Sequence, residues 1–136
     1  MNAALIDSNI FIGLWHKGDQ YREKSIDIMN QFVDKKIGKM IITNYVLVEV
    51  INFLIKKMRF EDSIKAYVSL TDTERVQLIY VDKLMQNEIG RLLAQYKTLS
   101  LTDCSLIVLA RELNVPVIYS YDSGFDKVPG LKRKES

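Results

Sequence analysis

The sequence contains very little cysteine or histidine. Cys104 and His16 are the only residues of these two types in the chain of 136 residues. One cysteine excludes an intramolecular disulfide, and one histidine excludes acid–base catalysis by a pair of histidines. A chain without disulfides fits a reducing compartment, so we expect a cytoplasmic protein.

Long apolar runs, internal repeats and low-complexity segments are also missing. Charged residues interrupt the apolar runs well before the roughly 20 residues that a membrane-spanning helix needs. The N-terminus lacks the basic region, apolar stretch and cleavage site of a signal peptide. The two prolines, Pro116 and Pro129, lie late, and no Pro-, Gly- or Ser-rich linker divides the chain. We expect one compact domain over residues 1–136, large enough to bury a core without staples.

The charge is nearly balanced, with a net charge of +2 and a pI near 8.6. A dedicated nucleic-acid binder is usually more basic than this. If acidic residues gather in one cleft, however, the remaining surface is more basic than the total suggests. Composition therefore permits a nucleic acid as substrate without arguing for one.

Short apolar strands alternate with amphipathic segments along the whole chain. We expect strands at 1–6, 40–42, 76–81 and 117–119, and helices at 10–15, 21–36, 45–58, 61–71, 82–96 and 100–114. The tail after position 122 is expected to be loop with a short final strand. Ser8 or Asn9 is expected to cap the first helix, and Thr43 or Asn44 the third. The faces expected to point inward carry Ile26, Met29, Phe32 and Val33; Ile64, Tyr67, Val68 and Leu70; Leu84, Ile89, Leu92 and Leu93; and Leu106, Leu109, Ala110 and Leu113.

This alternation predicts an α/β fold with a parallel sheet covered by helices on both faces. In such sheets, ligand sites form beyond the carboxyl ends of the strands, where the strand order reverses. The residues that follow the predicted strands are therefore the candidates for a ligand site.

Three acidic residues stand at strand ends or helix starts. Asp7 follows the first strand, Asp122 follows the fourth, and Asp103 opens the last helix. Each also has a structural interpretation, as a helix cap, as a turn residue and as an anion at the positive end of a helix dipole, respectively. The sequence alone leaves both roles open for each of the three.

Glu49 is the only acidic or basic residue between positions 45 and 55, in an otherwise apolar helix. Burying a lone carboxylate costs several kcal/mol unless a cation or hydrogen bonds compensate. No basic residue lies within one helical turn, so a buried Glu49 needs a metal ion or a distant partner. The alternative is a narrow exposed stripe that Glu49 shares with Asn52.

Carboxylates that converge without cysteine or histidine indicate Mg²⁺ or Mn²⁺ rather than zinc. Such a cation binds a phosphate oxygen and lowers the pKa of a bound water. His16, beside Trp15, is interpreted as partly buried structure. Cys104 is interpreted as core packing, because no histidine is near in sequence to activate it.

Taken together, these residues resemble the PIN-domain nucleases, and among them the VapC-type toxins of toxin–antitoxin pairs. The resemblance covers nearly the whole chain and rests on the order and spacing of Asp7-Ser8-Asn9, Thr43 with Glu49, Leu101-Thr102-Asp103 and Ser120-Tyr121-Asp122 with Phe125-Asp126. It implies a three-layer α/β/α sandwich around a short parallel sheet. Residue by residue, Asp7, Glu49, Asp103 and Asp122 match the family's acidic metal-binding cluster, and Asn9, Thr43, Ser120 and Asp126 match positions that line or support it.

The resemblance implies an endoribonuclease that cleaves single-stranded or looped RNA with one or two Mg²⁺ or Mn²⁺ ions. A metal-activated water would leave a 5′-phosphate and a 3′-hydroxyl. An antitoxin protein is the implied partner. Candidates for phosphate contacts, against the alternative of a solvated surface, are Lys35, Lys36, Lys39, Lys56, Lys57, Arg59, Lys132, Arg133 and Lys134.

A homodimer is predicted from a surplus of large apolar side chains, unless these complete the core: Leu14, Trp15, Phe53, Leu54, Ile55 and Phe60. A housekeeping RNA-processing nuclease remains an alternative function, as does a PIN-like fold kept only for assembly. A phosphoacceptor signalling domain would need adjacent acids after the first strand, and a haloacid-dehalogenase-like phosphatase would need Asp-x-Asp there. Position 9 is Asn and only Asp7 is acidic, so both are disfavoured.

Overall fold

The computed structural model describes residues 2–136, and its elements follow the predicted alternation. Met1, expected to open the first strand, lies outside the described residues. The strands are β1 (Ala3–Ile6), β2 (Lys39–Thr43), β3 (Val76–Ile79), β4 (Val117–Tyr119) and β5 (Lys132–Lys134). The helices are α1 (Ser8–Trp15), α2 (Arg22–Val33), α3 (Asn44–Lys57), α4 (Phe60–Thr71), α5 (Lys83–Gln95), α6 (Leu101–Leu113) and the short 3-10 helix η1 (Ser123–Lys127).

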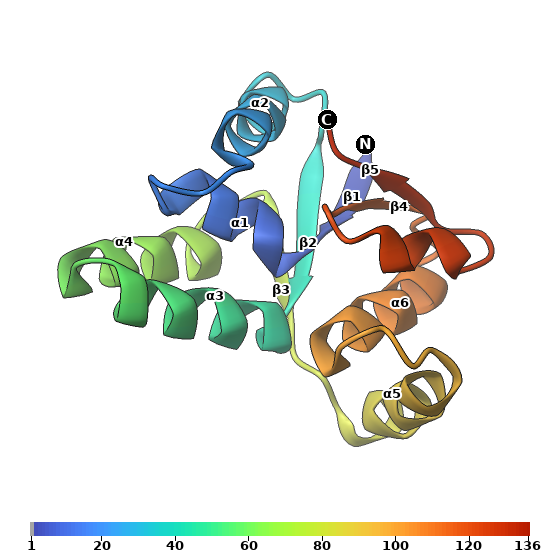
Figure 1. Cartoon of the computed structure of the whole chain (residues 1–136). Coiled ribbons are helices and arrows are strands. Elements are labelled where there is room, and N and C mark those ends of the chain that lie inside the picture. Colours follow the sequence, from blue (N-terminus) through green and yellow to red (C-terminus); the bar gives the residue numbers. More distant parts are fainter. Residues whose placement is uncertain (1) are drawn as a thin grey trace.

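The five strands form one sheet in the order β3-β2-β1-β4-β5, and all neighbouring strands are parallel (Figure 1). The chain builds outward from β1 through β2 and β3, and then returns to add β4 and β5 on the other side of β1. The strand order therefore reverses between β1 and β4, and this is where parallel sheets of this kind form their sites.

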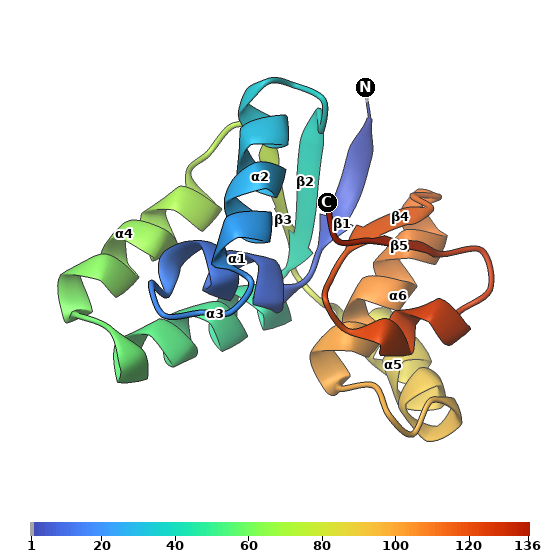
Figure 2. The same cartoon turned by 45° about the horizontal axis from the view of Figure 1, so that its top comes forward.

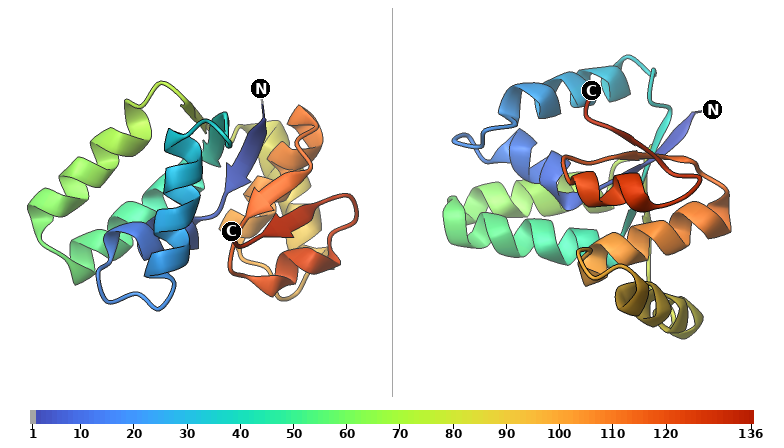
Figure 3. Two further views of the ribbon diagram at one scale, coloured as in Figure 1. Left: turned by 90° about the horizontal axis from the view of Figure 1, so that it is seen from above. Right: turned by 45° about the vertical axis from the view of Figure 1, so that its right-hand side comes forward.

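Helices lie on both sides of the strands, as predicted. Helices α1 to α4 lie on one side, and α5 and α6 lie on the other (Figures 1 and 2). Figure 3 shows the same separation from above. The central strands are buried in full, with Leu5, Ile6, Ile42 and Ile118 each 0% exposed. This is the predicted α/β/α sandwich. Among residues 2–136, no helix has the length and apolar character to cross a membrane.

The predicted inward faces of α2, α4 and α5 are only partly right. Phe32, Leu70, Ile89 and Leu92 are buried as predicted, whereas other residues predicted to point inward are exposed. The sides of α2 and α4 that face the core carry small residues, because small side chains let these helices approach their neighbours closely. Ser25 is 0%, Ser63 1% and Ala66 2% exposed. Expected core residues that are exposed instead are Ile26 (37%), Val33 (63%), Ile64 (48%), Tyr67 (47%), Val68 (51%), Leu84 (78%), Leu93 (42%) and Leu113 (40%).

The ends of three elements also differ from expectation. Asp7, rather than Ser8 or Asn9, caps α1, and its side chain accepts a hydrogen bond from the Ser8 N–H. Helix α2 ends at Val33 rather than near position 36, because Lys35 adopts a left-handed φ of 63°. The tail forms η1 before the short final strand. Thr43 caps α3, which is one of the two residues predicted to do so.

Candidate active site

Asp7 ends β1 and caps α1, so its carboxylate lies at the carboxyl edge of the sheet. The residue is 3% exposed. Its Oδ1 accepts a hydrogen bond from the Ser8 N–H (2.8 Å), and its Oδ2 accepts one from the Ser120 hydroxyl (2.7 Å). The Asp7 N–H donates to the Tyr119 carbonyl of β4 (3.0 Å). Asp7 is therefore held from both strands that flank the reversal of strand order.

Asp103 lies in the first turn of α6 and is 7% exposed. It forms a capping box with Ser100: the Ser100 N–H donates to Asp103 Oδ2 (3.0 Å), and the Asp103 N–H donates to Ser100 Oγ (3.1 Å). The structural role that the sequence left open is thus present. It uses Oδ2 and leaves Oδ1 outside the box.

Glu49 lies on the exposed side of α3, beside Val48 (54% exposed) and in line with Asn52. Of the two interpretations left open by the sequence, the exposed stripe is correct, and the argument from burial does not apply. The Ser8 hydroxyl donates to Glu49 Oε1, and the Thr102 hydroxyl donates to Oε2 (3.0 Å). Glu49 therefore bridges the N-terminal turns of α1 and α6.

Asp122 lies in the loop after β4 and caps η1. Its Oδ1 accepts a hydrogen bond from the Gly124 N–H (2.8 Å), and its own N–H donates to Ser120 Oγ (3.0 Å). A Cβ atom at Gly124 would lie 2.8 Å from Leu99 Cδ2 and 3.0 Å from Asp122 Oδ1. Glycine at position 124 is therefore needed for the turn that sets the Asp122 carboxylate.

These four residues, Asp7, Glu49, Asp103 and Asp122, form what we call the acidic cluster. Burial, followed by the charge of Asp103, raises the pKa of Asp7 from 3.8 to about 7, against the hydrogen bonds that it accepts. Burial likewise raises the pKa of Asp103 to about 6, and the charges of Asp122 and Glu49 add to this. None of the ion pairs found in residues 2–136 involves any of the four. The cluster is an accumulation of like charge without a cationic side chain.

The donor chemistry of the acidic cluster fits a hard divalent cation, because carboxylate oxygens are preferred ligands of Mg²⁺ and Mn²⁺ and a cation would relieve the repulsion. Over residues 2–136, no three His, Cys, Asp or Glu side chains already stand in an arrangement that holds a metal. Glu49 is turned toward the hydroxyls of Ser8 and Thr102 instead. Binding a cation by three or more of these carboxylates therefore requires their side chains to move closer together.

Asn9 and Ser120 lie beside the acidic cluster, where the resemblance predicts supporting residues. The Asn9 side-chain amide donates to Ser120 Oγ (3.3 Å), and its carbonyl oxygen accepts from the Tyr121 N–H (3.3 Å). Ser120 is 0% exposed and joins Asp7 to the backbone of Asp122. Together they fix the loop after β4 against the start of α1.

A chain of hydroxyl groups was missed by the sequence analysis. Thr43 Oγ1 lies 2.9 Å from Ser105 Oγ, and the Ser105 hydroxyl donates to the Thr102 carbonyl (2.6 Å). Thr102 in turn donates to Glu49. Thr43 thus acts on the acidic cluster through α6 rather than directly. The only sequence signal was the density of Ser and Thr around Asp103.

Asp126 supports the site indirectly, through Arg133. The Arg133 guanidinium donates to Asp126 Oδ1 (2.9 Å) and Oδ2 (3.2 Å), to Glu135 Oε2 (2.9 Å) and to the Ser120 carbonyl (3.2 Å). These bonds lower the pKa of both Asp126 and Glu135. Lys24 completes this Arg133 cluster through an ion pair with Glu135 (3.1 Å). Four of the five guanidinium N–H groups of Arg133 are therefore used within the protein, which makes it a weaker candidate for a phosphate contact than a free lysine.

The other basic residues predicted to contact phosphate differ in whether they already form an ion pair within the protein. Arg59 pairs with Glu61 at 3.6 Å, whereas the seven lysines of the predicted set take part in none of the ion pairs found in residues 2–136.

His16 packs edge-on against Phe53, with ring centroids 5.3 Å apart, which agrees with a structural role. Cys104 is 0% exposed, and burial raises the pKa of its thiol to about 11, so it is an inert core residue.

Comparisons with known proteins agree with the fold. The sequence model of the PIN domain family matches residues 4–131. The chain therefore belongs to the PIN domain family. Within it, a VapC ribonuclease from Archaeoglobus fulgidus is 32% identical over 127 residues, which are 90% of this chain and 79% of the relative. This relationship places the chain with the VapC-type toxin ribonucleases.

Solved structures share the fold at lower sequence identity. Mycobacterium tuberculosis VapC20, a toxin that cleaves the sarcin–ricin loop, has a TM-score of 0.80 at 15% identity, covering 93% of this chain and 95% of that one. A toxin–antitoxin complex from Klebsiella pneumoniae has a TM-score of 0.70 at 18% identity, covering 98% of both chains. VapBC2 from Rickettsia felis, bound to a promoter DNA fragment, has a TM-score of 0.69 at 14% identity, covering 97% of both.

Proposed function

We propose that this protein is a metal-dependent endoribonuclease whose active site is the acidic cluster, Asp7, Glu49, Asp103 and Asp122. The observation that carries the proposal is the gathering of four carboxylates at the reversal of strand order, where burial raises the pKa values of Asp7 and Asp103 and no ion pair found in residues 2–136 involves any of the four. Structural carboxylates are ordinarily paired or solvated, so an unpaired buried group with a strongly shifted pKa favours a functional site. The VapC ribonuclease relative supports the same activity.

One or two Mg²⁺ or Mn²⁺ ions, when bound, supply positive charge to the phosphate and a water of lowered pKa. The protein's part is to hold the carboxylate oxygens in place before substrate arrives. Asp7 and Asp103 are anchored by backbone N–H groups at the helix starts. Because the pKa of Asp7 is about 7, its carboxyl holds a proton for part of the time at neutral pH and releases it when positive charge approaches.

The proposed substrate is single-stranded or looped RNA, because an open edge of a sheet can reach a backbone whose bases are unstacked. We further propose that the protein is the toxin of a pair. Its structural neighbours include toxin–antitoxin complexes. An antitoxin arginine entering the cleft would pair with the carboxylates that have no cation of their own.

A homodimer is also proposed, on a smaller apolar surplus than the sequence suggested. Of the six side chains predicted to be in surplus, Leu54 is fully buried and Leu14, Trp15 and Phe53 are partly covered. Ile55 (48%) and Phe60 (64%) remain exposed. Light scattering at micromolar concentration is expected to give the mass of two chains, and the mass of one chain would refute the dimer.

The test of the activity is cleavage of a labelled single-stranded RNA by the purified protein in EDTA, in Mg²⁺ and in Mn²⁺. We expect cleavage only with metal, and none by Asp7→Asn under any condition. Asp72→Asn, an exposed aspartate at the far end of α4, is the matched control and should cleave normally. Cleavage in EDTA that Asp7→Asn retains would exclude the proposed mechanism.

A further inference from the structure

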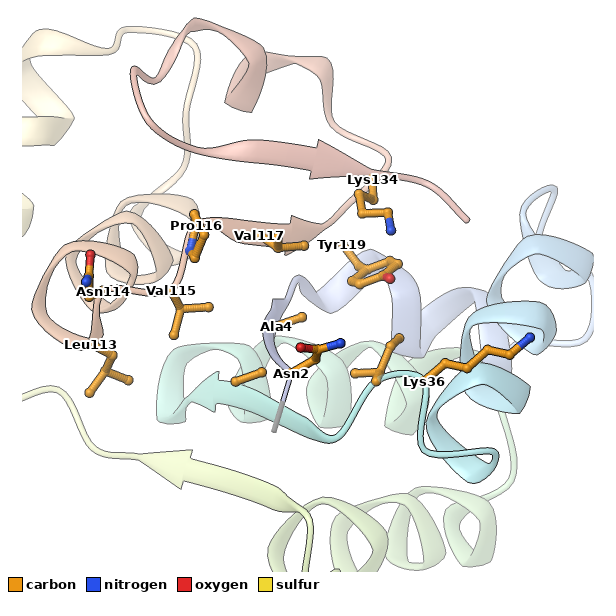
Figure 4. A pocket seen from close by; sticks show the side chains of 12 residues that line it. Asn2, Ala4, Lys36, Leu113, Asn114, Val115, Pro116, Val117, Tyr119 and Lys134 are labelled. Atoms are coloured by element: carbon orange, nitrogen blue, oxygen red, sulfur yellow. The ribbon is translucent and has the colours of Figure 1, made fainter.

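A hollow that none of the four acidic-cluster residues lines lies between the turn after α2, the turn before β4 and one face of β4 and β5. Its volume is about 640 Å³. Figure 4 shows Lys36 on one wall, Lys134 on the opposite one and Val117 and Tyr119 along β4 between them, with Asn114 at one end. We call this hollow the lysine groove.

The register of the sheet explains why lysines gather here. Val117 pairs with Lys132, and Tyr119 pairs with Lys134, in the parallel ladder of β4 and β5. Paired residues of neighbouring strands point to the same face of a sheet. Lys132 and Lys134 therefore project on the side of β4 that forms the floor of the groove, and the Lys134 ammonium lies 5.5 Å from the centre of the Tyr119 ring.

Every charged side chain that lines the lysine groove is cationic. Lys36 and Lys134 line it, no acidic residue does, and neither lysine belongs to any ion pair found in residues 2–136. Lys35 and Lys39 flank Lys36 along the chain. Because the whole chain carries a net charge of only +2, this is a local concentration of positive charge. Charge complementarity calls for an anionic ligand.

The polar and apolar lining favours a nucleic acid strand over an acidic peptide. Asn2 and Asn114 supply amide groups that both donate and accept hydrogen bonds, as ribose and base edges require. Ala4 and Val117 leave a small-residue floor on which a sugar or base can lie. An acidic peptide could use the lysines and pair its backbone with the amides, but it would offer no ring to lie on the floor of Ala4 and Val117.

The proposed function supplies the reason for such a surface. Four carboxylates in the acidic cluster repel the phosphates of RNA, so attraction to the strand must come from elsewhere on the protein. The groove adjoins the cluster along β4: Tyr119 lines its floor, while the Tyr119 carbonyl accepts the Asp7 N–H (3.0 Å) and the next residue, Ser120, donates to Asp7.

We propose that the lysine groove is a second RNA-contact site, which binds the phosphates of single-stranded RNA outside the segment held at the acidic cluster. The inference rests on the proposed function, but it concerns binding and not cleavage. Lys36 and Lys134 neutralise phosphates, with Lys132 beside them, and the groove adds affinity without reading sequence.

The test uses the full chain carrying Asp7→Asn, so that RNA is not cut, and measures the fluorescence anisotropy of a labelled single-stranded RNA in EDTA at several salt concentrations. Added Lys36→Glu and Lys134→Glu should weaken binding about tenfold or more and lower the salt slope by about 2. The matched control is Lys17→Glu with Lys65→Glu. These two lysines line a different hollow, and their substitution changes the net charge by the same amount. The control should weaken RNA binding by less than about threefold. Lys36→Gln with Lys134→Gln should give an intermediate loss.

Equal losses in the groove and control pairs would overturn the proposal, since total charge would then explain binding. Tighter binding of a labelled poly-glutamate peptide than of RNA would also overturn it, and would point to an acidic protein partner. Melting temperatures of all variants report whether they are folded. Cleavage by the unaltered protein is measured separately, so the groove and the proposed function can fail independently.

Discussion

Two groups of carboxylates, both hydrogen-bonded to Ser120 or to the arginine that binds it, have opposite environments in the fold. In the Arg133 cluster, Asp126 and Glu135 share one guanidinium, and their pKa values are lowered. In the acidic cluster, Asp7 has only hydroxyl and N–H donors, and burial raises its pKa to about 7. The first arrangement satisfies its charges and stabilises the tail. The second arrangement leaves the carboxylate charges without a cation, and this lowers the stability of the fold. Such a destabilising arrangement is typical of a site that a cation or a substrate completes.

Removing one carboxylate from each group should give the largest difference between the acidic cluster and the Arg133 cluster. Asp103→Asn should lower RNA cleavage by about a thousandfold or more, equivalent to about 4 kcal/mol in the barrier, with the fold intact. Asp126→Asn, at an exposed ion pair, should change cleavage by less than about tenfold. The measurement is the initial rate in Mn²⁺ with circular dichroism of both variants. Equal losses would show that the acidic cluster has no special role.

Metal binding should depend on the acidic cluster and not on the Arg133 cluster. Because a cation binds the folded acidic cluster and not the open chain, metal at about 100 times its dissociation constant should stabilise the protein by about 2.7 kcal/mol. A thermal melt in millimolar Mn²⁺ against EDTA measures this. Glu49→Gln should reduce the shift, whereas Glu135→Gln in the Arg133 cluster should leave it unchanged. If the melting temperature of the unaltered protein does not change with Mn²⁺, the acidic cluster does not bind this metal.

Breaking the Arg133 cluster should have a smaller effect. Arg133 is 14% exposed, and Arg133→Met would remove the donor of the Ser120 carbonyl and of Asp126 and leave Glu135 with Lys24 alone, at a cost of about 1–3 kcal/mol. Arg91→Met removes an arginine that is 77% exposed and paired with Glu88, so urea denaturation should show a change within about 0.5 kcal/mol. If the two variants lose the same stability, Arg133 does not anchor the loop after β4.

The pH dependence of stability should have opposite signs in the two groups. The pKa of Asp7 rises from 3.8 in the unfolded chain to about 7 in the fold, so the folded state binds this proton more tightly. Its contribution to stability is therefore present below pH 4 and is lost as the pH rises toward 7. In EDTA, Asp7→Asn should lose less stability than the unaltered protein between pH 5 and pH 8, by about 2–3 kcal/mol.

Asp126 and Glu135 supply the contrast, because their pKa values are lowered in the fold. Their contribution is present at neutral pH and is lost only as the pH falls below their ordinary values of 3.8 and 4.5. Asp126→Asn should therefore leave the pH 5 to pH 8 difference unchanged. A parallel response of the Asp7 and Asp126 variants would contradict the assignment.

Those features of the molecule that depend on local sequence could be predicted well. The strands, the helix starts at Thr43 and Ser100, and the position of Asp7 and Asp122 beyond β1 and β4 follow from periodicity, capping and the geometry of parallel sheets. That these two residues meet follows from β1 and β4 being neighbours, which the strand pattern did not specify.

Features that depend on packing between distant segments could not be predicted in this way. Periodicity placed Ile64 and Tyr67 inward, whereas α4 buries Ser63 and Ala66, because the neighbouring helices select the side of close approach. The sequence left open whether Glu49 is buried or lies on an exposed stripe of its apolar helix, and the packing of α3 puts it on the stripe. Arg133 looked like a free cation in a basic tail, and only the fold brings Asp126 and the Ser120 carbonyl to it.

The hydrogen bond between Ser120 and Asp7 also bears on when this site can first exist. It joins residues 113 positions apart, and Glu49 is linked to Ser8 and Thr102 over 41 and 53 positions. A nascent chain emerges from its N-terminus, so β1, α1 and α3 are available long before β4 can dock beside β1. The acidic cluster is therefore assembled only after Ser120 and Asp122 have been synthesised and β4 has docked. For a ribonuclease, this order spares the message and the ribosome that are producing it.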